Sequence, residues 1–261
     1  MPQYGRKEEK MVKVIINGCN GKMGQMLSEI IAPMEDVTIV AGVDVEDKGL
    51  HSYPVFTSIE ACGVEADAVI DFTIAAITDD VVTACTEKKL PLVLGTTGLS
   101  GEQLEHVRQA SQQIPIVQSY NMSLGINTLV KLLRAAAPVL AEAGFDIELV
   151  EKHHNQKIDA PSGTALLLAD TVNQACGNGY QYIYDRSAVR EKRRKNQIGI
   201  SSLRGGTIVG EHKVIFAGTD EVISLKHEAF SKAVFAKGAV QAAKFLKEKE
   251  KGLYTMQDVI A

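Results

Sequence analysis

A stretch of fifteen residues, EKHHNQKIDAPSGTA at positions 151–165, concentrates side chains that can do chemistry. His153 and His154 are adjacent, and an imidazole can exchange protons at neutral pH because its unperturbed pKa is about 6.5. Lys157, a few residues on, supplies a fixed positive charge. The combination indicates acid–base chemistry on a negatively charged compound.

The second part of this stretch is a Pro-Ser-Gly-Thr turn that precedes an apolar segment with helical spacing. Ser162 and Thr164 offer hydroxyl groups, and Gly163 permits close approach to the backbone. A helix that begins here presents N–H groups without partners, which favour anions. Together with Lys157, the turn provides two kinds of site for a small compound with two carboxylates.

A metal site and a purely structural role are the competing interpretations. Neighbouring residues of a strand point to opposite faces, so His153 and His154 are badly placed to bind one metal ion together. The chain also contains no H-x-x-x-H or H-E-x-x-H spacing. A strand end and a helix cap would explain any one of these residues, but not five polar residues together. We therefore expect an acid–base site and no metal.

The first half of the chain alternates apolar runs with helical patterns. Strands are predicted at 11–18, 37–44, 66–73, 90–98 and 114–119. Helices are predicted at 22–32, 75–88 and 100–112, the last with a capping box of Ser100 and Gln103. Uniformly apolar strands that alternate with helices predict an α/β domain with a doubly wound parallel sheet.

The second half predicts a mixed α+β domain. It contains helical patterns at 127–144 and 163–175 and strand-like runs at 145–154, 198–204, 207–218 and 221–230. Gly205-Gly206 and residues 218–221 resemble hairpin turns between the last three runs. An amphipathic helix over 231–250 could pack back on the first domain. We expect one domain of residues 1–122 and 231–261, with 1–10 as an extension, and a second of residues 123–230.

The turn GCNGKMG follows the first predicted strand and spaces its glycines as G-x-x-G-x-x-G, at 18, 21 and 24. Such a turn can hold a pyrophosphate at the start of the following helix. Asp44 ends the second strand, where it is either a ribose acceptor or an ordinary strand-end aspartate. GTTG at 95–98 closes another strand at the same sheet edge. The first domain is therefore predicted to bind a dinucleotide.

Composition and charge narrow the class of protein. The net charge of −4 argues against a nucleic-acid binder, and the basic run REKRRK at 190–195 is best explained as a solvated loop. Four separated cysteines predict reduced thiols rather than disulfides. The polar N-terminus is not a signal peptide, and no apolar run approaches the roughly 18 residues of a membrane span. A cytoplasmic protein without membrane partners is expected.

Several motifs together resemble the 4-hydroxy-tetrahydrodipicolinate (dihydrodipicolinate) reductase family. The match is nearly continuous from His153 to Ala165, and it extends in order to GCNGKMG, DFT, GTTG, YNMSLGIN and RGGTIVGEH. The resemblance implies a Rossmann-type dinucleotide-binding domain and a substrate domain that builds a homotetramer. It also implies NADH- or NADPH-dependent reduction of a cyclic dicarboxylate in diaminopimelate and lysine biosynthesis.

The same resemblance implies roles for individual residues. His153 becomes the proton donor with Lys157 as its electrostatic partner, and the substrate carboxylates would be held by His154, Lys157, Ser162, Gly163 and Thr164. The implied cofactor positions are Gly18, Cys19, Asn20, Gly21, Lys22, Met23, Asp44, Gly95, Thr96, Thr97, Ser119, Tyr120, Asn121 and Met122.

Two departures from the family pattern concern the cofactor and one loop. Val45 stands after Asp44, where some members place an arginine suited to a 2′-phosphate, so NADH is slightly favoured unless Lys22 or Lys48 serves that phosphate. The loop 177–197 carries no family motif. A related amino-acid dehydrogenase of the aspartate or homoserine type is an alternative function. A non-catalytic nicotinamide-sensing module is another.

Overall fold

The computed structural model describes residues 11–184, 186–187 and 190–261, and the chain divides into two compact units. The first contains residues 11–124 and 233–261, and the second contains residues 125–232. Each unit has its own sheet and its own core.

The first unit contains a seven-stranded sheet in which every neighbouring pair is parallel. In the order β12-β6-β5-β4-β1-β2-β3, its strands are Gly252–Tyr254, Pro115–Gln118, Leu92–Leu94, Ala68–Asp71, Val12–Asn17, Val37–Val43 and Val55–Phe56. The helices are α1 (Lys22–Ile31), η1 (Ala75–Ile77), α2 (Thr78–Glu87), α3 (Gly101–Ala110), α6 (Ala233–Leu246) and α7 (Met256–Val259).

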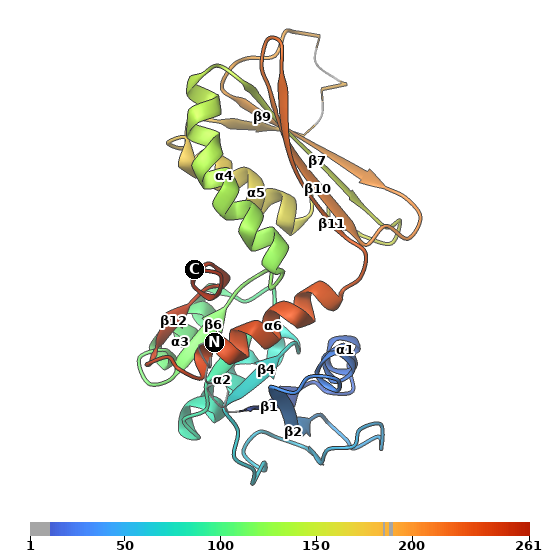
Figure 1. The fold of residues 1–261 in the computed structure, drawn as a ribbon, viewed down its shortest axis with the longest axis vertical. Helices are drawn as coiled ribbons and strands as arrows, with labels where there is room; N and C mark the ends of the chain where they lie inside the picture. Colours follow the sequence, from blue (N-terminus) through green and yellow to red (C-terminus); the bar gives the residue numbers. More distant parts are fainter. Residues whose placement is uncertain (1–10, 185, 188–189) are drawn as a thin grey trace, which may run out of the picture. The chain divides into compact units, whose positions relative to one another are not determined.

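Helices cover both faces of this sheet (Figure 1). Val14 and Ile16 of β1 pack with α1 and α6 in one core, whereas Ile15 packs with α2 and α3 in another. Because successive side chains of a strand are buried in different cores, the sequences of these strands are uniformly apolar. The predicted doubly wound sheet is confirmed, and so is the capping box of Ser100 and Gln103. Strands β3 and β12 were not predicted, because two or three residues carry no readable periodicity.

The order of the strands reverses at β1, which pairs with β2 on one side and with β4 on the other. Ligands of such folds bind at the carboxyl ends of the strands beside this point. The ends of β1 and β4, at Asn17 and Asp71, therefore mark the expected site.

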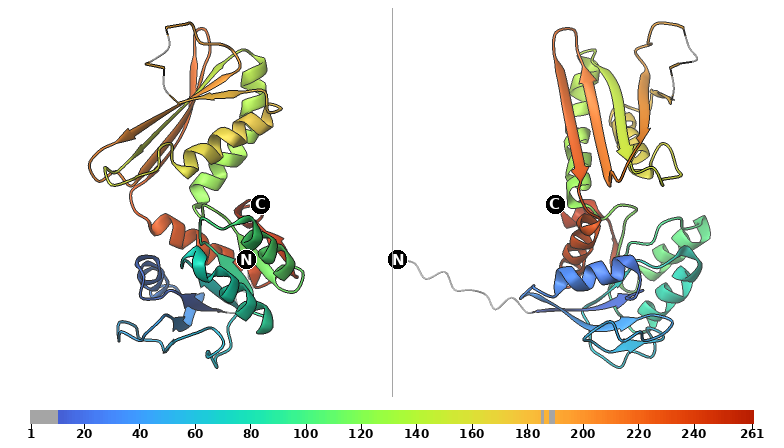
Figure 2. Two further views of the ribbon diagram at one scale, coloured as in Figure 1. Left: turned by 180° about the vertical axis from the view of Figure 1, so that it is seen from behind. Right: turned by 90° about the vertical axis from the view of Figure 1, so that its right-hand side faces the viewer.

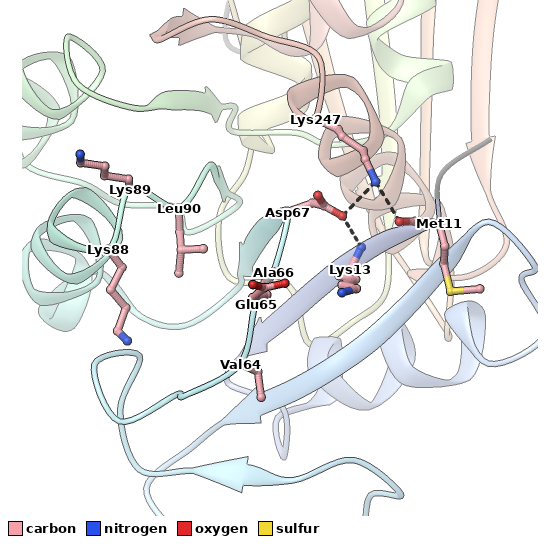
Figure 3. A pocket seen from close by; sticks show the side chains of 10 residues that line it. All are labelled: Met11, Lys13, Val64, Glu65, Ala66, Asp67, Lys88, Lys89, Leu90 and Lys247. Carbon is pink, nitrogen blue, oxygen red and sulfur yellow. Dashed lines mark hydrogen bonds and ion pairs between the residues drawn. The ribbon is translucent and has the colours of Figure 1, made fainter. Parts of the chain in front are cut away.

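The amino ends of the strands hold a different hollow, with a volume of about 730 Å³ (Figure 3). Asp67 lies in its wall and accepts hydrogen bonds from the backbone N–H of Lys13 (2.8 Å) and from Nζ of Lys247 (3.0 Å). These bonds tie β1 to the end of α6. We assign this hollow a structural role, since it lies at the opposite end of the strands from the expected crevice.

The second unit is a five-stranded mixed sheet with two helices on one face (Figures 1 and 2). In the order β11-β10-β7-β9-β8, the strands are Val222–Ala229, Gly210–Ala217, Asp146–His153, Gln197–Arg204 and Gln181–Ile183. The helices are α4 (Leu124–Glu142) and α5 (Gly163–Ala175).

One of the two predicted hairpins is wrong. Residues 218–221 do join the antiparallel strands β10 and β11, where Gly218 N–H donates to Glu221 O at 2.8 Å. Gly205-Gly206, however, does not join neighbouring strands. Strand β7 lies between β9 and β10, parallel to the former and antiparallel to the latter. A turn signal is local, so it cannot show that an earlier strand of the chain inserts between two later ones.

Helix α4 corrects the expectation that no apolar run approaches the length of a membrane span. By length and composition alone, this 19-residue helix could cross a membrane. Its buried residues Leu129, Leu133 and Ala137 instead pack against the second sheet. Lys131 and Arg134 interrupt its apolar sequence. Core helices of globular domains pass the same test, and the packing of these residues accounts for one face of α4.

Candidate active site

The ionisable residues of the 151–165 stretch lie at one end of the central strands of the second sheet. Strands β7 and β9 both finish at this end of the sheet, and the antiparallel strand β10 begins there. The register places His212 opposite Glu151 and Arg204 opposite His153. Because strand side chains alternate, all four share the face that also carries Leu149 and the core. The sheet therefore brings together residues that are up to 61 positions apart.

Glu151 is the centre of this cluster and is fully buried. Its Oε2 lies 2.5 Å from Nδ1 of His153, and Arg204 donates to both carboxylate oxygens at 2.7 and 2.8 Å. Burial raises the pKa of Glu151, but hydrogen bonds from Arg204, Ser202 and His153 outweigh burial and lower it to about 2. Glu151 is thus a carboxylate at neutral pH. It keeps the proton of neutral His153 on Nδ1 and leaves Nε2 as the nitrogen that exchanges protons.

The environment of His153 sets its protonation. Burial lowers the pKa of His153 most, the hydrogen bond and charge of Glu151 raise it, and the cations Lys157 and Arg204 lower it again. The net direction is downward from 6.5. The free protein therefore holds His153 mainly in its neutral form at neutral pH, and an arriving anion would favour its protonation.

Ser162 joins the same cluster to the start of α5. Its hydroxyl accepts from the N–H of Ala165 at 3.1 Å and so caps the helix, while its own N–H donates to Oε1 of Glu151 at 3.2 Å. Gly163 is the first residue of α5, where backbone N–H groups lack partners within the helix. One carboxylate thus fixes both the imidazole and the helix start, which holds the two predicted anion-handling features in a defined relation.

His212 is a member of the cluster that was not predicted as a site residue. Its Nε2 lies 2.9 Å from Oγ of Ser162, and its ring meets that of His153 edge-on at 5.1 Å. Burial, together with the nearby His153, lowers the pKa of His212 to about 4, so the imidazole is neutral at neutral pH.

Glu151 and Arg204 were also missed as site residues. Glu151 lies two residues before His153 and therefore shares its face of the strand, which is a signal that the alternation contains. Arg204 and His212 stand at the two ends of the motif RGGTIVGEH, but no local pattern shows what they touch.

Lys157 and His154 lie just beyond the end of β7. The ammonium of Lys157 is 2.7 Å from Oδ1 of Asp159. The backbone N–H of Lys157 donates to His154 O in the turn. The group hydrogen-bonded to His153 is Glu151, so Lys157 acts on His153 only through its charge. Asp159 holds the lysine side chain within the loop.

In the first unit, the glycine turn leaves only part of its backbone free. Gly18 has a φ of +78°, a conformation that favours glycine. The N–H groups of Cys19, Asn20 and Gly21 donate to Val43 O, Asp44 Oδ2 and Gly18 O. The first-turn N–H groups of α1, at Lys22 and Met23, have no partner within the helix and are the ones suited to a pyrophosphate.

Asp44, which follows β2, and Cys19, in the glycine turn, are two further predicted cofactor residues. Asp44 accepts from the N–H groups of Asn20 and Val45, each at 2.9 Å, and lies beside a hollow of about 310 Å³ at the strand ends. Cys19 points into the core, where burial and Asp44 raise the pKa of its thiol to about 11. Its side chain therefore packs rather than contacts a ligand.

A buried polar network at the ends of β1 and β4 was not predicted. Asp71 accepts from Nδ2 of Asn17 at 2.7 Å, from the hydroxyl of Thr73 at 2.7 Å and from that of Thr96 at 2.5 Å. Burial raises the pKa of Asp71 although these hydrogen bonds oppose it. The carboxyl group thereby fixes the GTTG loop, and this explains why Thr96 is buried.

The other predicted cofactor positions differ in exposure. Thr97 and Tyr120 are exposed, whereas Met122 is buried in the core with α6. Ser119 donates its hydroxyl hydrogen to Asn121 O at 3.0 Å. Gly95 has no room for a side chain, because a β-carbon there would lie 2.5 Å from the ring of Phe72. The side chain of Met122 thus holds the core rather than contacting a ligand.

Gly24 offers a direct test of the glycine turn. A β-carbon at this position would lie 2.3 Å from Gly18 O, so the turn and α1 would have to separate. Gly24→Ala should lower the free energy of unfolding by about 3 kcal/mol and weaken NADH binding. Urea unfolding and cofactor titration measure the two effects. Gly101→Ala is the matched control, since a β-carbon there meets nothing within 4 Å at the start of α3. Equal stability of both variants would contradict the prediction.

The fold, a Rossmann-like parallel sheet and a second unit with a mixed sheet, resembles the folds of solved two-domain dehydrogenases. C. glutamicum DAP dehydrogenase, for example, matches it with a TM-score of 0.57 at 13% identity, over 96% of this chain and 95% of the other. A likeness at that identity shows the fold alone. Dihydrodipicolinate reductase from Paenisporosarcina sp. TG-14 matches with a TM-score of 0.79 at 25% identity, over 94% and 97% of the two chains.

Sequence comparison gives the family. The models "dihydrodipicolinate reductase, N-terminus" and "dihydrodipicolinate reductase, C-terminus" match residues 12–122 and 125–260. The 4-hydroxy-tetrahydrodipicolinate reductases of Caldanaerobacter subterraneus and Clostridium tetani are 50% and 49% identical, over 96% and 94% of this chain and 98% and 96% of theirs. The chain therefore belongs to the dihydrodipicolinate reductase family. The expected family and its class, NAD(P)H-dependent oxidoreductases, are confirmed.

Proposed function

We propose that this chain reduces 4-hydroxy-tetrahydrodipicolinate to tetrahydrodipicolinate in diaminopimelate and lysine biosynthesis, with His153 as the proton donor. The observation that carries the assignment is the buried pair of Glu151 and His153, 2.5 Å apart. This pair fixes Nδ1 and leaves Nε2 to exchange a proton, next to a helix start suited to a carboxylate. NADH or NADPH, when bound, supplies the hydride.

The substrate is a ring with two carboxylates, and the second unit offers places for both. Ser162, Gly163 and Thr164 at the start of α5 would hold one carboxylate through hydroxyl and backbone N–H groups. Lys157 and His154 would hold the other. The Paenisporosarcina relative is described as dipicolinate-bound, and dipicolinate is a planar dicarboxylate of the same class. Two negative charges near His153 would raise its pKa and so load Nε2 with the proton that it donates.

The cofactor would be held by the first unit. The N–H groups of Lys22 and Met23 suit the pyrophosphate, and Asp44 suits a ribose hydroxyl. The loops at 95–97 and 119–122 complete the proposed contacts at the strand ends. Val45 after Asp44 supplies no charge for a 2′-phosphate, so NADH is slightly favoured over NADPH.

Lys157→Ala tests the carboxylate site. Loss of one charge-assisted hydrogen bond should raise KM for the substrate by about 10- to 100-fold and change kcat much less. Lys244→Ala is the control, because Lys244 pairs with Asp36 in the first unit, outside the second sheet and its cluster. An unchanged KM in Lys157→Ala would remove Lys157 from substrate binding.

The function itself is tested by a coupled assay. Purified protein should oxidise NADH or NADPH only when the product of dihydrodipicolinate synthase is supplied. Activity with an aspartate or homoserine substrate instead would support the related dehydrogenase. Calorimetry with pyridine-2,6-dicarboxylate separates both enzymes from a nicotinamide-sensing module, since only a substrate site would bind this dicarboxylate.

A cytoplasmic homotetramer is part of the same proposal. The face of the second sheet opposite α4 and α5 carries Val150, Leu203, Ile215 and Val222 among charged residues. No helix of the described part of this unit covers that face. Sedimentation equilibrium measures the mass, and a monomer at micromolar concentration would exclude the tetramer.

A further inference from the structure

Gly210, the first residue of β10, is the cross-strand neighbour of His153. Strand β10 pairs Glu211 with Lys152, which places Gly210 next to His153, and β9 places Arg204 on the other side. A β-carbon on Gly210 would lie 3.1 Å from Nε2 of His153 and 3.4 Å from its Cδ2. Any side chain at position 210 would therefore press on the nitrogen that exchanges protons.

The backbone does not demand glycine at this position. Gly210 has no left-handed φ, and it pairs in regular register with Ala229 of β11. An alanine could adopt the same conformation. The space beside the imidazole, however, is too small for a side chain at position 210. The glycine is therefore required by the neighbouring His153 and not by the backbone conformation of β10.

The imidazole cannot easily move away from a side chain at 210. Glu151 holds Nδ1 at 2.5 Å, and the ring of His212 stands edge-on at a centroid distance of 5.1 Å. A contact of 3.1 Å is shorter than ordinary van der Waals contact. A methyl group would have to displace the ring by a few tenths of an ångström or cover Nε2.

We propose that Gly210 is a positioning residue that keeps Nε2 of His153 open to the substrate, so that side-chain size at 210 sets the rate of proton transfer. The proposal rests on the proposed function. The proton passes from Nε2 to the ring carbon next to the one that accepts hydride, and Nε2 is left with its lone pair.

Gly210→Ala and Gly210→Ser test the proposal in the full-length protein. We expect kcat to fall by about 10- to 100-fold, since a misplacement of an ångström or less costs this much. The Kd values for pyridine-2,6-dicarboxylate and NADH should stay within about threefold of wild type, because neither the helix start nor the glycine turn changes. The solvent deuterium isotope effect on kcat should rise, because proton transfer becomes slower relative to the other steps. Gly179→Ala is the control, since a β-carbon there meets nothing within 4 Å.

Two results would overturn the proposal. One is a kcat and an isotope effect in Gly210→Ala equal to those of the active wild-type enzyme. That result would refute the role of Gly210 and leave the proposed function intact. The other is a parallel loss of stability, ligand binding and kcat with an unchanged isotope effect, which would make Gly210 a packing residue only.

A measurement on the wild-type protein keeps the test independent of whether the variants fold. Diethyl pyrocarbonate attacks unprotonated imidazole nitrogen, so peptide mapping should find His153 modified and protected by pyridine-2,6-dicarboxylate. Complete resistance of His153 without the dicarboxylate would show that Nε2 is not open.

Discussion

His153→Gln should lower kcat by about 10²- to 10⁴-fold, the usual contribution of a general acid. Glutamine can still donate a hydrogen bond to Glu151 through its amide, so the cluster keeps its buried carboxylate satisfied. The Kd for pyridine-2,6-dicarboxylate should therefore change little, and the free energy of unfolding should fall by no more than about 1 kcal/mol. Steady-state kinetics, calorimetry and urea unfolding measure these three quantities.

The pH dependence provides a second measurement on the same residue. A general acid must be protonated, so kcat/KM should fall as pH rises through the pKa of His153 in the free enzyme, which lies below 6.5. This falling limb should disappear in His153→Gln. His106→Gln is the control, because His106 pairs with Asp79 on the surface of the first unit. A normal kcat in His153→Gln would remove the proton-donor assignment.

Glu151→Gln should have the second large effect, because it acts on both catalysis and stability. The amide cannot neutralise Arg204, so a partly buried cation loses its ion-pair partner, and His153 is no longer held with its proton on Nδ1. We expect kcat to fall by about 10²- to 10⁴-fold, comparable to the loss of an orienting carboxylate in other sites. The free energy of unfolding should fall by about 3 kcal/mol.

The same substitution should change the acid sensitivity of the protein. The pKa of Glu151 is about 2 when folded and about 4.5 as its ordinary value, so the folded state binds fewer protons between these pH values. Its contribution of about 3 kcal/mol is present above pH 4.5 and is lost as pH falls towards 2. Unfolding measured against pH should lose this component in Glu151→Gln.

Glu105→Gln is the matched control for the charge change. Glu105 pairs with Arg108 on the surface of the first unit, where a solvent-exposed ion pair contributes little to stability. Equal effects of the two substitutions on kcat and acid stability would show that Glu151 is an ordinary charged residue.

Much of the fold followed from local patterns in the sequence. Apolar runs around Ile15 and Ile70 had to be buried on both faces, and this requires helices on both sides of a parallel sheet. The glycines at 18 and 24 predicted a tight turn at the start of α1, because only glycine fits these backbone positions. His153 and Ser162 stood out because their residue types occur together in one short stretch.

Only the tertiary structure decided how these elements meet. The place of β7 between β9 and β10 depends on hydrogen bonds between segments more than 40 residues apart, which no local turn signal encodes. That place sets Arg204 and Gly210 on either side of His153. The ion pair of Glu151 with Arg204, 53 residues apart, follows from this register. Periodicity in a sequence indicates which side chains are buried, whereas strand register determines which buried side chains contact one another. The chemistry of this site depends on those contacts.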